Sequence, residues 1–364
     1  MCLKKIRLVH AWSGLVLSFL LTVLSITGSM LIFKDDYLRA RFPEANGIGV
    51  FEPEAVGKAM ETIETQYGPD RLAYVSLARK NMSLHRIVFR DGSVAYAGQD
   101  GRVIQSWEKH GRIEDWIFHL HHYLFLGDFG KYLAGVTALC AVLMTATGIY
   151  LFLPFLPLFK GRPWPKSARR RDMLAHHRDL GVVFALPIII ITLTGAAMVF
   201  YKPAGSILSF LTLSKPAPFE RPTGEAGDIN WVAALKQAKT EFPEGEVRLV
   251  SWPRSTTAVG SIRMRLPGEW HQNGRTYAYI NPQTSTVVAT RNGNKLSRGE
   301  RASNAIYPLH SIGVGGRLYD LIGVLTGMAL TILGLFASWS YLNFLTGRRK
   351  KRRRQTAKQS LFTE

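Results

Sequence analysis

The chain has 364 residues, of which 47% are hydrophobic, and it carries a formal net charge of +20. Residues 8–33, 132–159, 180–201 and 321–347 contain no Lys, Arg, Asp or Glu, and the shortest of these stretches has 22 residues. A helix that spans a bilayer needs about 20 residues, so the composition excludes a soluble protein, and two cysteines exclude a secreted disulfide scaffold.

Apolar helices and longer polar segments alternate along the chain. In chain order we expect a transmembrane helix with a cytoplasmic N-terminus (1–33), an outer segment (34–115), a second helix with its outer entry (116–159), a basic cytoplasmic loop (160–172), a third helix (173–201), a second outer segment (202–306), a fourth helix with its entry (307–347) and a basic cytoplasmic tail (348–364). The first helix is expected to be retained, because its apolar run is longer than that of a signal peptide.

Basic residues concentrate on one side of this topology. The segment before the first helix, the loop 160–172 and the tail 348–364 hold seventeen basic and two acidic residues, which account for +15 of the +20. Cytoplasmic loops of membrane proteins carry such an excess, and it also attracts anionic lipid headgroups. The distribution therefore predicts a multi-pass protein of a bacterial inner membrane with both termini cytoplasmic, and it does not favour nucleic-acid binding.

The two outer segments have similar patterns. The first predicts a helix over 53–67 and strands over 72–77, 84–90, 93–97 and 102–107. The second predicts a helix over 231–242 and strands over 246–252, 259–266, 275–280 and 286–290. Alternating apolar residues between turn residues are typical of strands, so each segment is expected to form an α+β module with its own small antiparallel sheet.

The resemblance between the halves extends into the helices. Residues 8–14 match 175–181 at an offset of 167, and the second helices match at an offset of 188, which places His122 on His310. The Thr27-Gly28 pair likewise falls on Thr194-Gly195. We interpret the chain as a tandem duplication of helix, module and helix. The predicted fold is an α-helical four-span membrane bundle with two α+β periplasmic modules.

Histidines occupy equivalent places in the two halves. The topology puts His10 and His177 at the cytoplasmic ends of helices one and three, and His122 and His310 at the outer ends of helices two and four. A histidine near a span is costly unless it is paired or liganded, and neutral imidazole is an axial ligand of haem iron. The pattern predicts a haem at each membrane face, held by one histidine from each half. Glycine four residues after His10 and His177 would leave room for a flat macrocycle.

Other residues near the span ends allow more than one interpretation. His119, His121 and His176 are alternative ligands, supporting groups or plain interfacial residues. Zinc is less favoured, because the histidines are split between opposite faces and form no tetrahedral set. Residues at the helix entries are either substrate contacts or headgroup anchors: Lys109, Arg112, Trp116, Tyr123 and Tyr307. Three histidines in the outer segments are expected to be surface residues: His85, His110 and His271.

These motifs resemble the PepSY-associated transmembrane family over nearly the whole chain. The similarity is carried by 7–14, Thr27-Gly28, His121-His122, 175–181, Thr194-Gly195 and 307–310. Some members of the family are inner-membrane siderophore reductases with two bound haems of the b type and PepSY-like outer modules. The resemblance implies that His10 and His177 hold an inner haem and that His122 and His310 hold an outer haem.

The implied activity is that of a di-haem membrane oxidoreductase, which passes electrons to a periplasmic ferric siderophore and releases iron as iron(II). The chain contains no predicted nicotinamide or flavin module, so the expected donor is a membrane quinol or a cytoplasmic reductase. Two other functions stay open: a membrane-anchored PepSY-like regulator or binding protein, and a protein that handles haem itself. Transport is disfavoured, because no Pro/Gly-broken helix pairs are expected and Pro187 alone predicts a kink.

Overall fold

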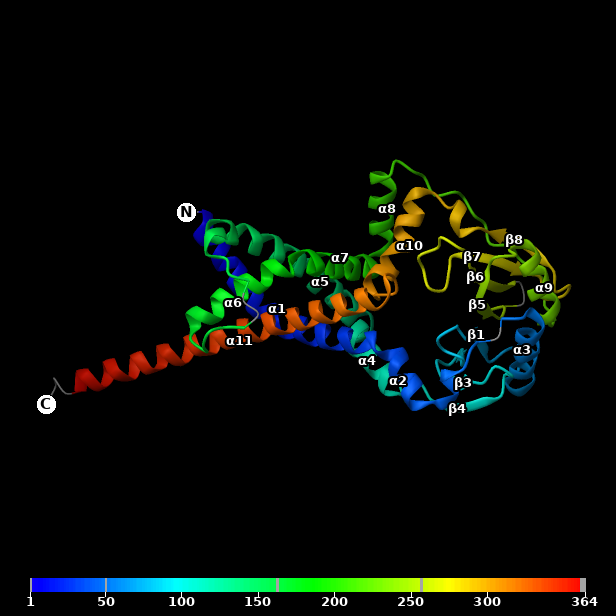
Figure 1. Ribbon diagram of the computed structural model, residues 1–364, viewed down its shortest axis with the longest axis horizontal. Helices are drawn as coiled ribbons and strands as arrows, with labels where there is room; N and C mark the ends of the chain where they lie inside the picture. Colours follow the sequence, from blue (N-terminus) through cyan, green and yellow to red (C-terminus); the bar gives the residue numbers. More distant parts are fainter. Residues whose placement is uncertain (1, 50, 162–163, 256–257, 361–364) are drawn as a thin grey trace. The chain divides into compact units, whose positions relative to one another are not determined.

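The computed structural model describes residues 2–49, 51–161, 164–255 and 258–360. The chain forms two compact units, each of which draws on both halves of the sequence (Figure 1). We call Met1–Ile32, Ile117–Phe200 and Gly315–Glu364 the helical unit, and Phe33–Trp116 and Tyr201–Val314 the sheet unit. Parts of the predicted basic loop and tail, residues 162–163 and 361–364, lie outside the described residues, as do the side chains of 344–360.

Long apolar helices make up the helical unit. Its elements are α1 (Cys2–Ile32), α5 (Gly127–Phe152), the 3-10 helix η2 (Leu153–Leu158), α6 (Arg170–Val183), α7 (Ala185–Val199) and α11 (Gly316–Ser360). Among the described residues, three segments are each long and apolar enough to cross a membrane as one helix: Leu3–Ile32, Gly127–Leu158 and Gly316–Asn343. They coincide with the first, second and fourth predicted spans, and they identify a membrane protein.

The third predicted span is a broken helix. A single helix with a kink at Pro187 was expected over 173–201, but α6 ends at Val183 and α7 leaves it at a bend of 68°. Proline has no N–H and its ring clashes with the carbonyl four residues earlier. For Pro187 that carbonyl belongs to Val183, which explains where α6 ends. The expectation that the chain has no proline-broken helix pair was therefore wrong.

Two further breaks separate the predicted entries from their helices. α4 (Ile113–Tyr123) is followed by Leu124 and Phe125 with φ of 48° and 57° before α5 begins. α10 (Arg298–His310) is followed by Ile312 and Gly315 with φ of 57° and 83° before α11 begins. Left-handed backbone ends a helix. The entries expected within 116–159 and 307–347 therefore belong to short helices that turns join to the spans.

Small and hydroxyl side chains join α1 to α11. Ser18 Oγ lies 2.9 Å from Ser338 Oγ, and Ser25 Oγ lies 2.8 Å from Thr331 Oγ1. A Cβ at Gly327 would overlap Ser29 Oγ, so the two backbones approach closely at this glycine. Close approach and hydrogen bonds between hydroxyl groups are the interactions that associate helices in lipid, where apolar burial contributes little.

The sheet unit contains every strand and helix predicted for the outer segments. Its elements are α2 (Lys34–Arg41), the 3-10 helix η1 (Pro43–Asn46), α3 (Pro53–Tyr67), β1 (Leu72–Ser76), β2 (His85–Phe89), β3 (Val94–Ala97), β4 (Val103–Trp107), α8 (Tyr201–Leu211), α9 (Trp231–Glu241), β5 (Glu246–Ser251), β6 (Gly260–Arg265), β7 (Thr276–Ile280), β8 (Val287–Arg291), the 3-10 helix η3 (Gly293–Lys295) and α10. Helices α2 and α8 were not predicted.

The strands form one sheet instead of the two that were expected. The order is β4-β3-β2-β1-β5-β6-β7-β8, and all neighbours are antiparallel. The halves meet where Val75 of β1 pairs with Val250 of β5. In two separate modules β1 and β5 would both be edge strands with unpaired backbone groups, and their pairing removes both edges. The outer segments therefore share a single sheet.

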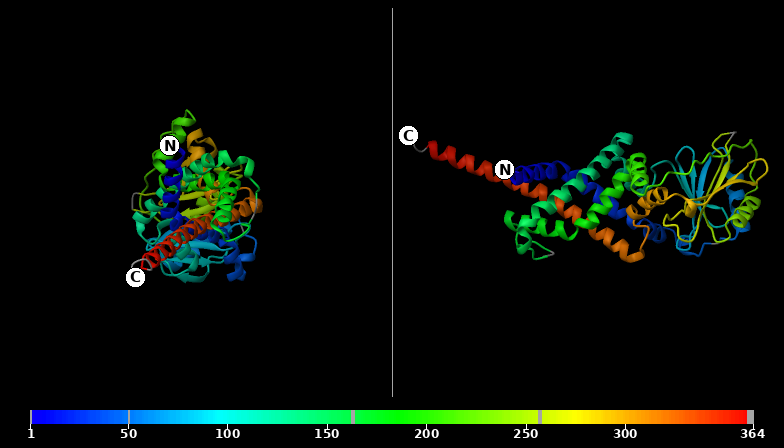
Figure 2. Two further views of the ribbon diagram at one scale, coloured as in Figure 1. Left: turned by 90° about the vertical axis from the view of Figure 1, so that its left-hand side faces the viewer. Right: turned by 90° about the horizontal axis from the view of Figure 1, so that it is seen from above.

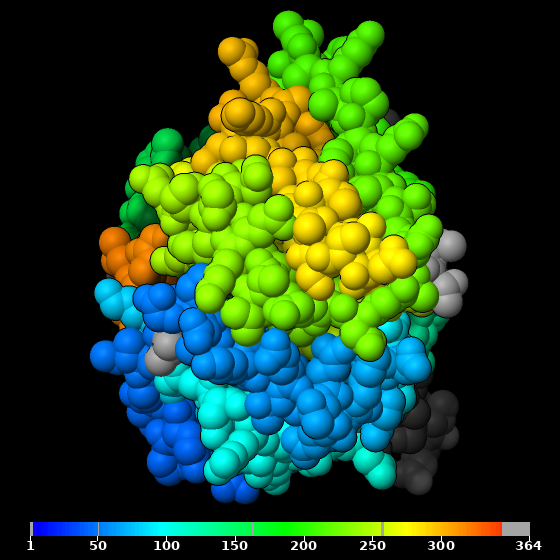
Figure 3. Space-filling view, turned by 90° about the vertical axis from the view of Figure 1, so that its right-hand side faces the viewer, coloured from blue at the N-terminus to red at the C-terminus, as the bar shows by residue number. Residues whose placement is uncertain are grey.

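Helices α3 and α9 pack on the same face of this sheet (Figures 1 and 2). A Cβ at Gly57 of α3 would lie 2.5 Å from Val232 Cγ2 and 2.6 Å from Val232 Cα, so only glycine allows this helix contact. Glu64 of α3 accepts hydrogen bonds from the indole N–H groups of Trp231 and Trp252, at 2.8 and 3.0 Å. Figure 3 shows the two halves meeting along one continuous seam on this face. One shared core thus supports both halves.

Candidate functional site

A cavity of about 500 Å³ lies within the helical unit. It is lined by α1, α5, α6 and α11, with smaller contributions from η2 and α7. Its walls are largely apolar, except for a few polar side chains that include His10, His177 and three arginines. Apolar cavities of about 300–1,000 Å³ with a few polar groups are typical sites for small molecules and cofactors.

His10 and His177 face each other in this cavity. Their ring centres are 6.5 Å apart and the ring planes are nearly perpendicular, at 85°. Two imidazole–metal bonds of about 2 Å, plus about 1 Å from each nitrogen to its ring centre, would separate the ring centres by about 6 Å. The observed separation therefore matches a metal ion ligated by both rings, as in a haem with two axial histidines.

A second contact orients the His10 ring. His10 Nδ1 lies 3.0 Å from Thr147 Oγ1, whose hydroxyl donates to the Leu143 carbonyl at 2.9 Å. The hydroxyl must then accept from His10 Nδ1–H, which leaves Nε2 of His10 without a proton. Ligand histidines in metal sites are usually held in this way, with one nitrogen on a protein group and the other on the metal.

Glycines and arginines complete the fit to a flat dianionic ring. Gly14 and Gly181 both line the cavity, and a Cβ at Gly181 would meet nothing within 4 Å. Arg7, Arg171 and Arg178 also line it, and Arg178 is already paired with Asp179 at 2.7 Å. Guanidinium groups suit the carboxylates of haem propionates. The residues present therefore fit a haem between His10 and His177.

His176 differs from its neighbour His177 in its surroundings. It is buried but does not line the cavity, and its ring packs edge-on against Phe336 at 5.4 Å. Neither ring nitrogen has a hydrogen-bond partner among the described residues. Of the two histidines that the sequence left as alternatives, His177 is the one that faces His10.

The three histidines of α4 have different contacts within the helical unit. His121 Nδ1 lies 3.1 Å from Thr27 Oγ1, and a Cβ at Gly28 would lie 2.9 Å from the same ring, so the Thr27-Gly28 pair forms a seat for His121. His122 stacks on Phe118 at 3.9 Å, with Nδ1 3.2 Å from the Phe118 carbonyl. A carbonyl only accepts, so Nδ1 of His122 carries the proton in this contact.

The predicted outer pair draws on both units. His122 belongs to the helical unit, whereas His310 is the last residue of α10 in the sheet unit. His119 packs edge-on against Tyr123 at 5.3 Å and remains an alternative to His122. The pairing of His122 with His310 stays a prediction. No cluster of three or more His, Cys, Asp or Glu side chains suited to a metal ion occurs in the described ranges.

Residues 7–343 match the family described as the PepSY-associated TM region. The chain belongs to this family. No curated protein matches the chain. In this PepSY-associated TM protein the matched residues include both the helical unit and the sheet unit. The long helices and the shared sheet therefore both belong to the region that defines the family.

Burial changes the interpretation of several polar residues of this PepSY-associated TM protein. His85 and His271, expected at the surface, are 1% and 6% exposed, whereas His110 is exposed as predicted. His85 Nδ1 accepts a hydrogen bond from the Ala78 N–H at 3.0 Å. Arg112, expected to contact substrate or headgroups, is buried in ion pairs within the sheet unit. Its guanidinium is therefore a structural group.

We expect the sheet unit to lose stability in mild acid. Burial lowers the pKa of His85 to about 4, so the unfolded chain binds more protons than the folded chain between about pH 4 and 6.5. The free energy of unfolding is then highest above pH 6.5, and the contribution of His85 to it falls by about 2–3 kcal/mol at about pH 4.5. Hydrogen exchange of the sheet amides at both pH values measures this loss.

Two variants isolate the contribution of His85. His85→Leu should reduce the pH dependence without abolishing it, because the pKa of His271 in the same unit is also lowered, to about 3. The variant also costs stability at neutral pH by removing the acceptor for Ala78. His110→Asn, at an exposed histidine, should leave the slope unchanged. The same slope in both variants would contradict the assignment to His85.

Proposed function

We propose that this protein is a haem-containing oxidoreductase of a bacterial inner membrane. In this proposal it passes electrons across the membrane to a ferric siderophore in the periplasm, which releases iron as iron(II). The single observation that carries the proposal is the cavity in which His10 and His177 lie 6.5 Å apart. Haem supplies reversible one-electron chemistry when it is bound between such ligands.

The residues around the cavity would control this chemistry. Thr147 holds the imidazole of His10 in place, which limits the reorganisation of that ligand when the charge changes. Apolar side chains keep water away, and Arg7 and Arg171 offer positive charge to propionates. Each of these features tunes a reduction potential.

The proposed topology has four spans and two cytoplasmic termini. It takes α6 and α7 together as one broken span, and it follows the concentration of basic residues in 1–7, 160–172 and 348–364. The mirrored strand order and the similar breaks after His122 and His310 support a tandem duplication.

Two haems are proposed because one macrocycle cannot bridge about 30 Å of apolar membrane. His122 and His310 would hold the outer haem, and a membrane quinol or a cytoplasmic reductase would supply the electrons. Reduction weakens the binding of iron by the hard oxygen donors of a siderophore, since iron(II) has the lower charge density. A single electron therefore releases the metal.

The test is an optical and EPR spectrum of the purified full chain, with haem and protein quantified separately. We expect low-spin signals typical of two axial histidines and about two haems per chain. Anaerobic addition of quinol, or of cytosolic extract, should reduce the haem, and a ferric siderophore should reoxidise it. A colourless protein, even when haem is supplied during expression, would overturn the proposal and favour a membrane-anchored regulator. Slow reversible loss of haem would favour haem handling instead.

A further inference from the structure

A second pocket, of about 320 Å³, lies in the sheet unit. One wall is the loop between β6 and β7, which contributes Glu269, His271 and Arg275. The opposite wall is the first half of α10, which contributes Arg298 and Arg301. A volume of this size is at the lower end of the range for small-molecule sites. It is larger than a single inorganic anion requires.

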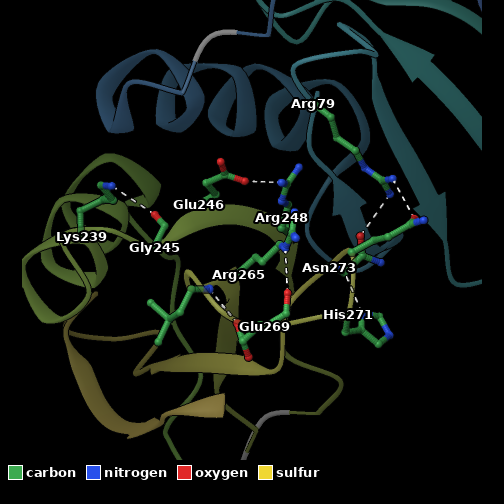
Figure 4. Close-up of polar contacts among 11 residues, drawn as sticks. Arg79, Lys239, Gly245, Glu246, Arg248, Arg265, Glu269, His271 and Asn273 are labelled. Atoms are coloured by element: carbon green, nitrogen blue, oxygen red, sulfur yellow. Dashed lines mark hydrogen bonds and ion pairs between the residues drawn. The ribbon is translucent and has the colours of Figure 1, made fainter. Parts of the chain in front are cut away.

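Glu269 is part of the framework of this pocket. Its carboxylate accepts hydrogen bonds from the backbone N–H groups of Leu266 and Arg275, both at 2.7 Å. Its carbonyl accepts from Arg265 Nε at 3.2 Å, as Figure 4 shows. A Cβ at Gly293 would overlap the Glu269 carboxylate, so glycine is required there. The one carboxylate that lines the pocket is thus already used in shaping the loop.

The arginine side chains that line the pocket, unlike Glu269, do not hold its loop in shape. Nε of Arg275 is buried and has no hydrogen-bond partner among the described residues. Arg298 and Arg301 are exposed side chains on α10, and no ion pair to them occurs within the described part of the chain. Three guanidinium groups therefore meet at a pocket that contains one carboxylate. An isolated buried donor is costly, and an anionic ligand would satisfy it.

The surroundings make the pocket more positive still. His271 packs against Arg263, with 3.3 Å between Arg263 Nη2 and His271 Nδ1. Arg79 is held nearby through Asn273 at 3.1 Å (Figure 4). Burial, followed by the charges of Arg275, Arg263, Arg79 and Arg265, lowers the pKa of His271 to about 3. His271 is therefore neutral at physiological pH and presents an uncharged ring to the pocket.

This neutral ring connects the pocket to the predicted outer ligand. His271 stacks on Tyr307 of α10 with ring centres 4.9 Å apart and an angle of 19° between the planes. Tyr307 lies three residues before His310, which is one turn of the same helix. Arg301 and His310 are nine residues apart in α10, or about 14 Å at about 1.5 Å per residue. Two arginines of the pocket and His310 therefore lie on the same helix.

We propose that this pocket binds the electron acceptor, and that the acceptor is an anionic iron(III) chelate with carboxylate groups. Planar guanidinium groups match carboxylates in two-point contacts. The inference rests on the proposed function for the redox step. In that step chelated iron(III) would gain one electron and become iron(II), and the electron would come from a reduced haem that His310 would help to hold and that would be oxidised in turn. No proton or covalent bond is transferred.

The test measures binding without redox chemistry, by calorimetry on the full chain in detergent with gallium(III) citrate as the probe. Arg298→Gln and Arg301→Gln should each weaken binding about tenfold, as expected for the loss of one charge-assisted hydrogen bond. Arg254→Gln is the matched control, because Arg254 is an exposed arginine of the same unit outside the pocket. It should leave the affinity unchanged. The haem content is measured in every sample.

The outcomes separate this inference from the proposed function. A protein that contains haem but does not bind gallium(III) citrate, or that binds inorganic phosphate equally well, would overturn the chelate site and leave the proposed function intact. An equal loss of affinity in Arg254→Gln would also overturn it. Binding that depends on Arg301 in a protein without haem would support the anion pocket but remove its role in electron transfer.

Discussion

His177→Ala is expected to remove one of the two proposed haems. The variant loses one axial ligand of the pair whose rings lie 6.5 Å apart, and the cavity it leaves has no second imidazole to face His10. The haem-to-protein ratio should fall from about two to about one, with loss of the corresponding low-spin EPR signal. Added imidazole should restore that signal, because the free ligand can enter the vacated space.

His176→Ala is the matched control for this experiment. It removes a buried histidine from the adjacent position of α6, but that ring does not line the cavity. Both haems should remain. Retention of both haems in His177→Ala, or loss of one in His176→Ala, would refute the assignment of the inner ligand. Gly181→Phe offers an independent check of the inner haem site. Its side chain would extend into the open space beside Gly181 and should also remove one haem.

Arg112→Met is expected to lower the free energy of unfolding of the sheet unit by about 3–5 kcal/mol, because it leaves charged partners without compensation. The Arg112 side chain is 2% exposed and that of its partner Glu114 is 7% exposed. Its guanidinium also pairs with Asp115 at 2.5 Å and donates to the Tyr96 hydroxyl at 2.8 Å. Denaturant-dependent hydrogen exchange of the sheet amides in the full chain measures the change.

Arg102→Met tests whether burial causes the large loss of unfolding free energy expected for Arg112→Met. Arg102 also pairs with an aspartate, Asp100, at 3.5 Å, but its side chain is 87% exposed. Exposed ion pairs contribute little, so this variant should change the free energy of unfolding by less than about 1 kcal/mol. Equal losses in the two arginine variants would mean that burial does not determine the effect.

Alternating apolar residues were enough to predict all eight strands to within one residue at each end. The same pattern contained the signal for the burial of His85, because it alternates with Ile87 and Phe89 on the core face of β2. A loop residue such as His271 has no such periodicity, so the sequence could not predict its burial. Position within an alternating pattern therefore decides what sequence can reveal about a histidine.

Pairing between the halves was harder to predict. Alternation defines a strand but not its neighbour, and nothing local distinguishes β1 at an edge from β1 beside β5. Charge does not help either, because the edge strand β4, Val103–Trp107, is as free of charged residues as β1, Leu72–Ser76. The break between α6 and α7 was signalled by Pro187, although a proline near the start of a helix is often tolerated.

In the helical unit, repeat register identified His10 and His177 as a pair before their distance was known. Register could not choose among the histidines of α4, because that choice depends on which ring faces Thr27 and which carbonyl holds His122. It also could not reveal the arginine pocket, which joins a loop of the sheet to a helix that follows it in the chain. Sites of this kind depend on contacts between separate helices and loops, which the order of residues in the sequence does not reveal.

The junction of β1 with β5 has a consequence for biosynthesis. When β1 leaves the ribosome, its partner in the second half lies 170 residues later, from Ser76 to Glu246. At about 5–20 residues per second, the nascent edge waits on the order of ten seconds. During that interval β1 is a template for intermolecular aggregation, so a holdase chaperone would be needed most before the second half is translated.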